Sequence, residues 1–201
     1  MARDPDNPYV SRGGLKLRAA LDAFALDATG LACADLGCST GGFTDCLLQA
    51  GAASVASVDT GYGVLDYTLR IDERVTVMER TNALHAEPVA GGVDLLVADA
   101  GWTPQRLLIP AALGWLRGGE SRIVSLIKPH YEVKGTPDEA ALEGGVLPDD
   151  VAEHVAERVA GAMPELGAQT LGLVKSPISG SKGKKRGNAE WLALLAPALS
   201  P

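Results

Sequence analysis

The residues best suited to chemistry lie in the stretch DLGCSTGGF, residues 35–43, where an acid precedes a run of glycines and hydroxyl groups. Glycines after a strand let a ligand approach the backbone closely. Ser39 stands where a dinucleotide-binding fingerprint has its second glycine, which disfavours a dinucleotide oxidoreductase. The acid Asp35 suits a cationic ligand such as S-adenosylmethionine, which carries an ammonium and a sulfonium. The alternative is a tight strand-to-helix turn that uses glycine for geometry alone.

Further polar residues stand where apolar runs end. Asp59, Asp99 and Lys128 fall at or just past the ends of three such runs, and Asn82 follows a fourth. Ligands of open parallel sheets bind at the carboxyl ends of the strands. Asp59 suits hydrogen bonds from ribose hydroxyls, as acids do in dinucleotide sites. Asn82 is placed to contact an adenine, with a helix cap or a turn as the alternative.

The elements that would position these residues alternate between strand-like and helix-like patterns. Apolar runs predict strands at 31–36, 54–59, 74–78, 93–98, 122–127 and 168–175, and a last strand at 189–195. Helical patterns fall at 14–26, 42–51, 64–71, 104–117 and 147–163. The alternation predicts an α/β fold with an open, mostly parallel seven-stranded sheet and helices on both faces. We expect one domain over residues 1–201, in which residues 1–30 form an arm and a helix.

The charge of the chain is uneven. The 201 residues carry a formal net charge of −7, which opposes bulk attraction to nucleic acid. Basic residues nevertheless gather in two places, Arg12 to Arg18 near the start and the loop SGSKGKKRGN at 179–188. These clusters would form one basic patch if the fold brought them together.

The sequence also indicates where the protein works. No apolar run reaches the length of a membrane span, and the first residues lack the apolar centre of a signal peptide. Cys33, Cys38 and Cys46 fit no zinc pattern and are typical of buried thiols in a reducing compartment. We therefore expect a cytoplasmic protein that binds no membrane and no metal. A membrane-lytic activity is disfavoured because no strongly basic amphipathic helix is evident.

Several stretches together resemble the FtsJ-like ribosomal RNA 2′-O-methyltransferases, and most closely their TlyA branch, often labelled hemolysin A. They follow the order of that family: YVSRGGLKL (9–17), DLGCSTGGFTDCLLQAGA (35–52), VDTGYGVL (58–65), LRIDERV (69–75), ERTN (79–82), LIKPHYE (126–132) and SPISGSKG with GNAEWL (176–192). The resemblance implies a Rossmann-like methyltransferase fold, S-adenosylmethionine as cofactor, and ribosomal RNA or a ribosomal subunit as partner. It also implies a catalytic tetrad, which falls on Lys16, Asp99, Lys128 and Glu190.

The same resemblance marks a cofactor site. Ser39, Thr40 and Gly41 should hold the amino-acid end of the cofactor, and Asp35 either binds its ammonium directly or braces the loop. The full set of expected cofactor contacts is Asp35, Gly37, Ser39, Thr40, Gly41, Asp59, Asn82 and Asp99.

The implied tetrad suits the reaction. A ribose 2′-hydroxyl must lose its proton as it attacks a methyl group, or be held in line with it. A lysine acts as the base only when it is neutral, which burial or a second cation nearby favours. We expect Lys128 to be the general base, Asp99 and Lys16 to position and tune it, and Glu190 to orient these groups. Taken singly, each residue has a plainer interpretation as a surface or strand-end residue.

Two features depart from the TlyA pattern. The segment after the motif aspartate reads DAGWTPQ (99–105), where that branch usually has DVSFISL, and it should lie beside the acceptor pocket. Only eight residues precede YVSRGG, so we expect the branch's small N-terminal RNA-binding domain to be missing. Trp102 or Tyr131 offers a stacking surface for a base, with core packing as the alternative. The expected substrate contacts are Arg12, Trp102, Tyr131, Lys182, Lys184 and Lys185.

Three functions remain open at this point. Methylation of ribosomal RNA at a ribose hydroxyl leads, while the acidic charge and the DAGWTPQ segment favour a small molecule or free nucleoside as the alternative acceptor. A non-catalytic cofactor-binding module is the third, and an intact tetrad argues against it. The modified nucleotide and the oligomeric state are left open by the sequence.

Overall fold

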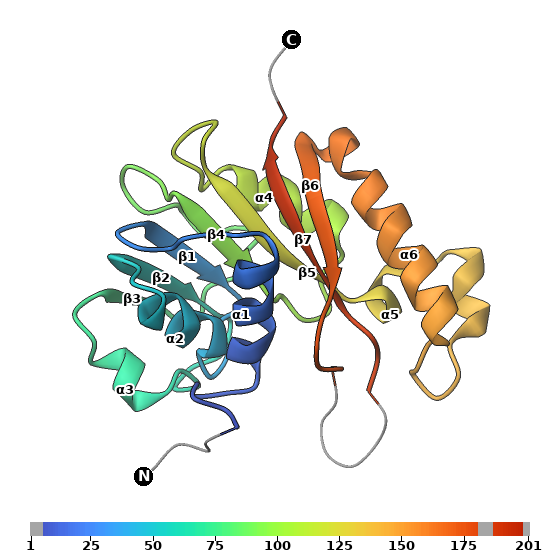
Figure 1. Ribbon diagram of the computed structural model, residues 1–201, viewed down its shortest axis with the longest axis horizontal. Coiled ribbons are helices and arrows are strands. Elements are labelled where there is room, and N and C mark those ends of the chain that lie inside the picture. The colour runs from blue at the N-terminus through green and yellow to red at the C-terminus, as the bar shows by residue number, and fades with distance from the viewer. Residues whose placement is uncertain (1–5, 181–186, 199–201) are drawn as a thin grey trace.

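The computed structural model describes residues 6–180 and 187–198, so the expected substrate contacts Lys182, Lys184 and Lys185 lie outside the described residues. Within these ranges seven strands form one sheet, in the order β3-β2-β1-β4-β5-β7-β6 (Figure 1). The strands are β1 (Ala32–Leu36), β2 (Ser54–Val58), β3 (Val75–Met78), β4 (Leu95–Ala98), β5 (Arg122–Ile127), β6 (Ala168–Lys175) and β7 (Trp191–Pro197). β1 to β5 run parallel, and β7 lies antiparallel between β5 and β6. The predicted fold class is confirmed.

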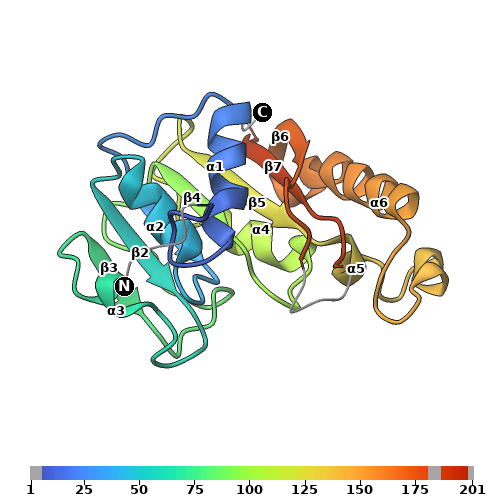
Figure 2. The same cartoon turned by 60° about the horizontal axis from the view of Figure 1, so that its bottom comes forward.

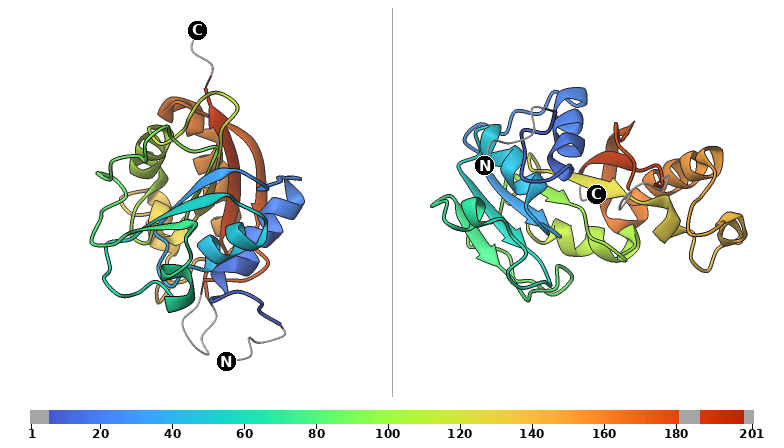
Figure 3. Two further views of the ribbon diagram at one scale, coloured as in Figure 1. Left: turned by 90° about the vertical axis from the view of Figure 1, so that its left-hand side faces the viewer. Right: turned by 90° about the horizontal axis from the view of Figure 1, so that it is seen from below.

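Helices cover both faces of the sheet (Figure 3). α1 (Gly13–Ala23) and α2 (Gly42–Gln49) pack on one face, and α4 (Gln105–Leu113) and α6 (Asp149–Gly161) pack on the other. Short helices α3 (Tyr67–Arg70) and α5 (Pro129–Glu132) and the 3₁₀ turns η1 (Pro137–Ala141) and η2 (Met163–Leu166) lie in the connections. Among the described residues, no helix is both long and apolar enough to cross a membrane.

Alternation along each strand divides the core into two layers. On β4, Leu95 and Val97 pack with α1 and α2, whereas Leu96 and Ala98 pack with α4 and α6. Successive side chains of a strand point to opposite faces, so both faces of these central strands are apolar. The same alternation continues into the residue that follows each strand. It therefore determines on which side of the sheet the side chains at the strand ends lie.

All five predicted helices are shorter in the structure, and local contacts explain two of these differences. The helix expected at 64–71 begins only after Asp66, whose carboxylate accepts a hydrogen bond from the Thr68 amide and so caps α3. The helix expected at 104–117 ends at Leu113, because the chain turns back and the Val93 amide donates to the Trp115 carbonyl. α5 was not predicted, because LIKPHYE reads as the end of a strand followed by a turn.

Candidate active site

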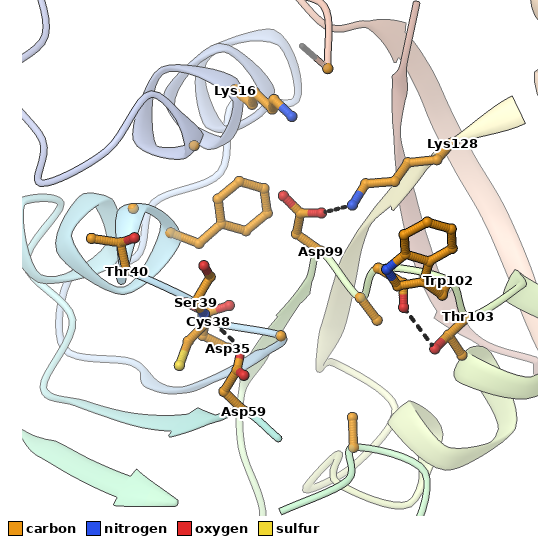
Figure 4. A pocket seen from close by; sticks show the side chains of 18 of the residues that line it. Lys16, Asp35, Cys38, Ser39, Thr40, Asp59, Asp99, Trp102, Thr103 and Lys128 are labelled. Carbon is orange, nitrogen blue, oxygen red and sulfur yellow. Dashed lines mark hydrogen bonds and ion pairs between the residues drawn. The ribbon is translucent and has the colours of Figure 1, made fainter. Parts of the chain in front are cut away.

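A cavity of about 750 Å³ opens at the carboxyl ends of β1, β2, β4 and β5. Figure 2 brings this end of the sheet toward the viewer, and Figure 4 shows the cavity from close by. The glycine turn after β1 forms one side of it, and the segments that follow β4 and β5 form the other. All four members of the expected tetrad line this cavity.

The first pair of the tetrad joins the two ends of the chain. Lys16, on α1, places Nζ 2.5 Å from Glu190 Oε2, just before β7, and the two residues are only 9% and 3% exposed. Burial raises the pKa of the Glu190 carboxyl above its usual range, and the adjacent Lys16 opposes that shift. Gly180 leaves the space this carboxylate needs, because a Cβ there would lie 2.1 Å from Glu190 Oε1.

The second pair comes from neighbouring strand ends. The Lys128 ammonium forms an ion pair with Asp99 Oδ1 (Figure 4). Asp99 continues the alternation of Leu95 and Val97, and Lys128 continues that of Val124 and Leu126, so both occupy the side of the sheet that α1 covers. Glu190 follows the same rule from Leu192 and Leu194. The sheet therefore delivers three of the four residues to the face where α1 brings Lys16.

Asp35 is completely buried behind the glycine turn. Its Oδ2 accepts hydrogen bonds from the Thr44 amide at 2.9 Å and the Thr44 hydroxyl at 2.7 Å, and that hydroxyl lies 2.8 Å from Ser57 Oγ. Within the described ranges, Oδ1 finds no hydrogen-bond partner. Burial raises the pKa of Asp35 to about 7. The contacts to Thr44 favour the bracing alternative, and Oδ1 remains as an acceptor at the wall of the cavity.

The turn itself is held by close backbone contacts. Gly37 adopts φ +87°, and a Cβ there would lie 2.7 Å from the Asp99 carbonyl oxygen. Asp59 Oδ2 accepts a hydrogen bond from the Ser39 amide at 2.8 Å, so the end of β2 fixes the tip of the turn. Gly41 faces α3, where a Cβ would meet the Leu69 side chain, and it is absent from the cavity lining of the described residues.

Asn82 was predicted to contact a ligand or to form a cap or turn, and its position is compatible with both. It lines the cavity after β3, and its Oδ1 accepts a hydrogen bond from the Leu84 amide at 2.9 Å, which makes it a turn residue as well. Its amide nitrogen remains available to a ligand in that arrangement.

The opposite rim of the cavity is aromatic. Trp102 is 84% exposed, and its ring centroid lies 5.0 Å from that of Tyr131. Core packing is therefore not the role of Trp102. Lys128 Nζ lies 5.9 Å from the centre of the Tyr131 ring. Burial, together with Lys128 and Lys16, lowers the pKa of the neighbouring His130 to about 4, so this imidazole is neutral at physiological pH.

The sequence suggested that two basic clusters could form one patch, but two of the three basic residues in the first cluster are paired with carboxylates. Arg12 lines the cavity, but Lys16 is buried against Glu190, and the Arg18 guanidinium lies 2.5 Å from Asp22 Oδ1. The basic residues of the second cluster, Lys182, Lys184, Lys185 and Arg186, all lie outside the described residues.

Sequence reasoning missed several residues that shape the cavity. Thr44 and Ser57 complete the polar network of Asp35, and Gly180 makes room for Glu190. Thr44 could have been suspected because it is a hydroxyl residue in the first turn of the helix after the glycines. The role of Gly180 depends on a contact distant in the chain and carries no local signal.

The sheet order and the strand-end cavity define the class, an α/β methyltransferase fold. A solved S-adenosylmethionine-dependent methyltransferase from Mesorhizobium loti shares this fold at a TM-score of 0.60 and 15% identity, covering 89% of this chain and 96% of that one. A solved candidate hemolysin from Streptococcus thermophilus matches at a TM-score of 0.87 and 36% identity, covering 100% of this chain and 70% of that one.

The FtsJ-like methyltransferase profile matches residues 9–186. The chain is 43% identical over 184 residues to the 16S/23S rRNA (cytidine-2′-O)-methyltransferase TlyA of Mycobacterium tuberculosis, covering 90% of this chain and 67% of that protein. It is 34% identical to Hemolysin A of Brachyspira hyodysenteriae, covering 92% and 75%. The chain belongs to the FtsJ-like methyltransferase family. It spans about two thirds of the length of its TlyA relative.

Proposed function

We propose that this protein transfers a methyl group from S-adenosylmethionine to a ribose 2′-hydroxyl of ribosomal RNA, with Lys16, Asp99, Lys128 and Glu190 as its catalytic tetrad. The observation that carries the proposal is the convergence of two lysine–carboxylate pairs in one cavity beside the glycine turn. Burying ion pairs costs free energy of desolvation, so two of them lining one cavity indicate a functional site.

The residues of the turn fit the cofactor. Gly37 lets the backbone of the turn approach β4 where a side chain would collide, and buried Asp35 offers an unused acceptor oxygen for an ammonium. Asp59 and Asn82 stand further along the same wall, at positions suited to a ribose and a base. S-adenosylmethionine, when bound, supplies an electrophilic methyl group on its sulfonium. Gly41, which faces α3, would support the turn and make no contact of its own.

The tetrad residues then act on the acceptor. Lys128 Nζ, held by Asp99, would take the proton of the ribose hydroxyl as that oxygen bonds to the methyl carbon. The bond from the methyl carbon to sulfur would break at the same time, so that the cofactor leaves as a neutral thioether. Glu190 fixes the ammonium of Lys16 in the same cavity, where Lys16 helps to hold the acceptor beside Lys128. Because the methyl donor is already reactive, most of the rate enhancement comes from holding the hydroxyl in line.

Two observations favour RNA over a small acceptor. The named TlyA relative acts on the 16S and 23S ribosomal RNAs. In a chain with 4% aromatic residues, Trp102 lines the cavity after β4 and is nevertheless 84% exposed. Exposed aromatic rings beside a cavity suit the stacking of unpaired bases. The net charge of −7 is the observation that favours a small molecule or free nucleoside instead.

A transfer assay with labelled S-adenosylmethionine tests the proposal. The acceptors are ribosomal subunits and naked ribosomal RNA lacking the modification, and free nucleosides. We expect label in the RNA or the subunits and none in nucleosides. Label in nucleosides alone would replace the proposal with a small-molecule enzyme, and cofactor binding without transfer to any acceptor would leave only the non-catalytic module.

A further inference from the structure

Two chain segments on the acceptor side of the cavity are joined to each other at both ends. One runs from Asp99 to Gln105, between β4 and α4, and the other runs from Lys128 to Glu132, after β5. The Asp99–Lys128 ion pair joins them at the cavity. At the far end, Glu132 Oε1 accepts a hydrogen bond of 2.9 Å from the Gln105 amide. We call this second contact the Gln105–Glu132 brace.

The brace is anchored on both sides. Gln105 is 3% exposed, and its side-chain amide donates to the Leu126 carbonyl at 3.1 Å and accepts from the Ser125 hydroxyl at 2.7 Å, so it is fixed to β5. Gln105 is also the first residue of α4, where amides lack partners within the helix. Its predecessor Pro104 has no side chain that can cap the helix, so Glu132 supplies the acceptor from another segment.

The aromatic pair lies between the two joined ends. Trp102 stands midway along its segment and contacts Tyr131, the residue before Glu132 in the other, at 5.0 Å between ring centroids. Trp102 adopts φ +62°, a left-handed conformation that a bulky aromatic residue rarely takes. With 84% of its surface exposed, burial does little to hold it there. The fixed ends of the segment must therefore impose this backbone shape.

We propose that Glu132 is a positioning residue for the acceptor. Through the Gln105 amide it sets the shape of the Asp99–Gln105 segment, and with it the placement of the Trp102–Tyr131 pair beside Lys128. The inference rests on the proposed function for the identity of the acceptor. It predicts that losing the brace weakens acceptor binding and leaves the cofactor side, built on β1 and β2, unchanged.

Charge offers a competing account of Glu132, because Arg106 and Arg158 act on its carboxylate electrostatically. The two accounts separate with Glu132→Gln, which keeps an oxygen for the Gln105 amide and removes the charge. Glu132→Ala removes both. Thr170→Val is the matched control. It deletes one partly buried hydrogen bond, which the Thr170 hydroxyl donates to the Ala160 carbonyl at 2.7 Å, and Thr170 does not line the cavity.

The test labels the full chain with 5-fluorotryptophan and records the fluorine spectrum of each variant, with Trp102→Phe used to assign the Trp102 line. Methyl transfer to naked ribosomal RNA and binding of S-adenosylmethionine are measured on the same proteins. For Glu132→Ala we expect a shifted or broadened Trp102 line and an acceptor KM raised about tenfold, with cofactor affinity unchanged. Glu132→Gln and Thr170→Val should keep the wild-type Trp102 line and acceptor KM.

Two results would overturn the proposal. An unchanged Trp102 line in Glu132→Ala would show that the brace does not set the segment. If the Trp102 fluorine line shifted as far in Glu132→Gln as in Glu132→Ala, the effect would belong to the charge of Glu132 and not to the hydrogen bond. The fluorine spectra need no methylated acceptor, so they decide the brace even if the wild-type protein methylates no RNA and the proposed function fails.

Discussion

Lys128 carries the most specific chemical claim at the scale of single residues. Lys128→Arg keeps a cation beside Asp99, but a guanidinium stays protonated and cannot accept the hydroxyl proton. We expect this variant to lose about 100-fold or more in kcat while binding S-adenosylmethionine normally. The exposed Lys134→Arg, six residues further along the chain, is the control and should keep full activity. Activity retained in Lys128→Arg would reduce Lys128 to an electrostatic role.

Asp35 gives a pH dependence of stability. Burial raises its folded-state pKa to about 7, above the usual 3.8, so the folded protein binds more protons than the unfolded chain between these values. The stability that the neutral carboxyl contributes is complete below pH 3.8 and is lost as the pH rises through 7. Between these limits it falls by about 1.4 kcal/mol per pH unit.

Asp35→Asn should remove that slope, because the amide oxygen still accepts from Thr44 and the side chain no longer titrates. Urea unfolding of both proteins from pH 4 to pH 8, without cofactor, measures the difference between the two stability curves. Parallel curves would show that Asp35 does not titrate in this range.

At the scale of elements, the turn after β1 can be tested by adding one methyl group. Gly37→Ala combines a left-handed backbone with a Cβ 2.7 Å from the Asp99 carbonyl oxygen. Gly30→Ala is a matched control, since Gly30 has φ +73° and a Cβ there meets nothing within 4 Å among the described atoms. We expect Gly30→Ala to cost about 1 kcal/mol of unfolding free energy. Gly37→Ala should cost clearly more and also weaken S-adenosylmethionine binding, and equal costs would contradict the close approach of the turn to β4.

The elements also show what the sequence could predict. Alternating apolar runs located every strand to within two residues at either end, because buried central strands carry unbroken apolar runs between turn residues. The face on which Asp99, Lys128 and Glu190 lie follows from the same alternation. The pairing of Lys16 with Glu190 could not be predicted from spacing, since 174 residues separate them and only the packing of α1 beside β7 unites them. The Gln105–Glu132 brace could not be predicted either, because one of its partners is a backbone amide, which every residue except proline carries.

The whole molecule poses the question of how an acidic chain would bind RNA. Its net charge of −7 predicts weak non-specific attraction, so binding should depend on stacking and on few phosphate contacts. We expect the affinity for naked ribosomal RNA to fall with salt with a shallow log–log slope, equivalent to roughly two to four phosphate contacts. A filter-binding titration over a salt series checks this, with a free nucleoside as the control ligand. A slope near zero would favour the small-molecule alternative.

The position of the transferred methyl group on the RNA decides whether this protein is a ribose methyltransferase. Ribosomal RNA lacking the modification is incubated with the protein and S-adenosylmethionine, digested to nucleosides and fragmented in a mass spectrometer, with Lys128→Arg in parallel. The account predicts a methyl group on the ribose fragment of one nucleoside with the wild-type protein, and its loss in the variant. A methyl group on the base fragment, or equal ribose methylation by Lys128→Arg, would contradict it.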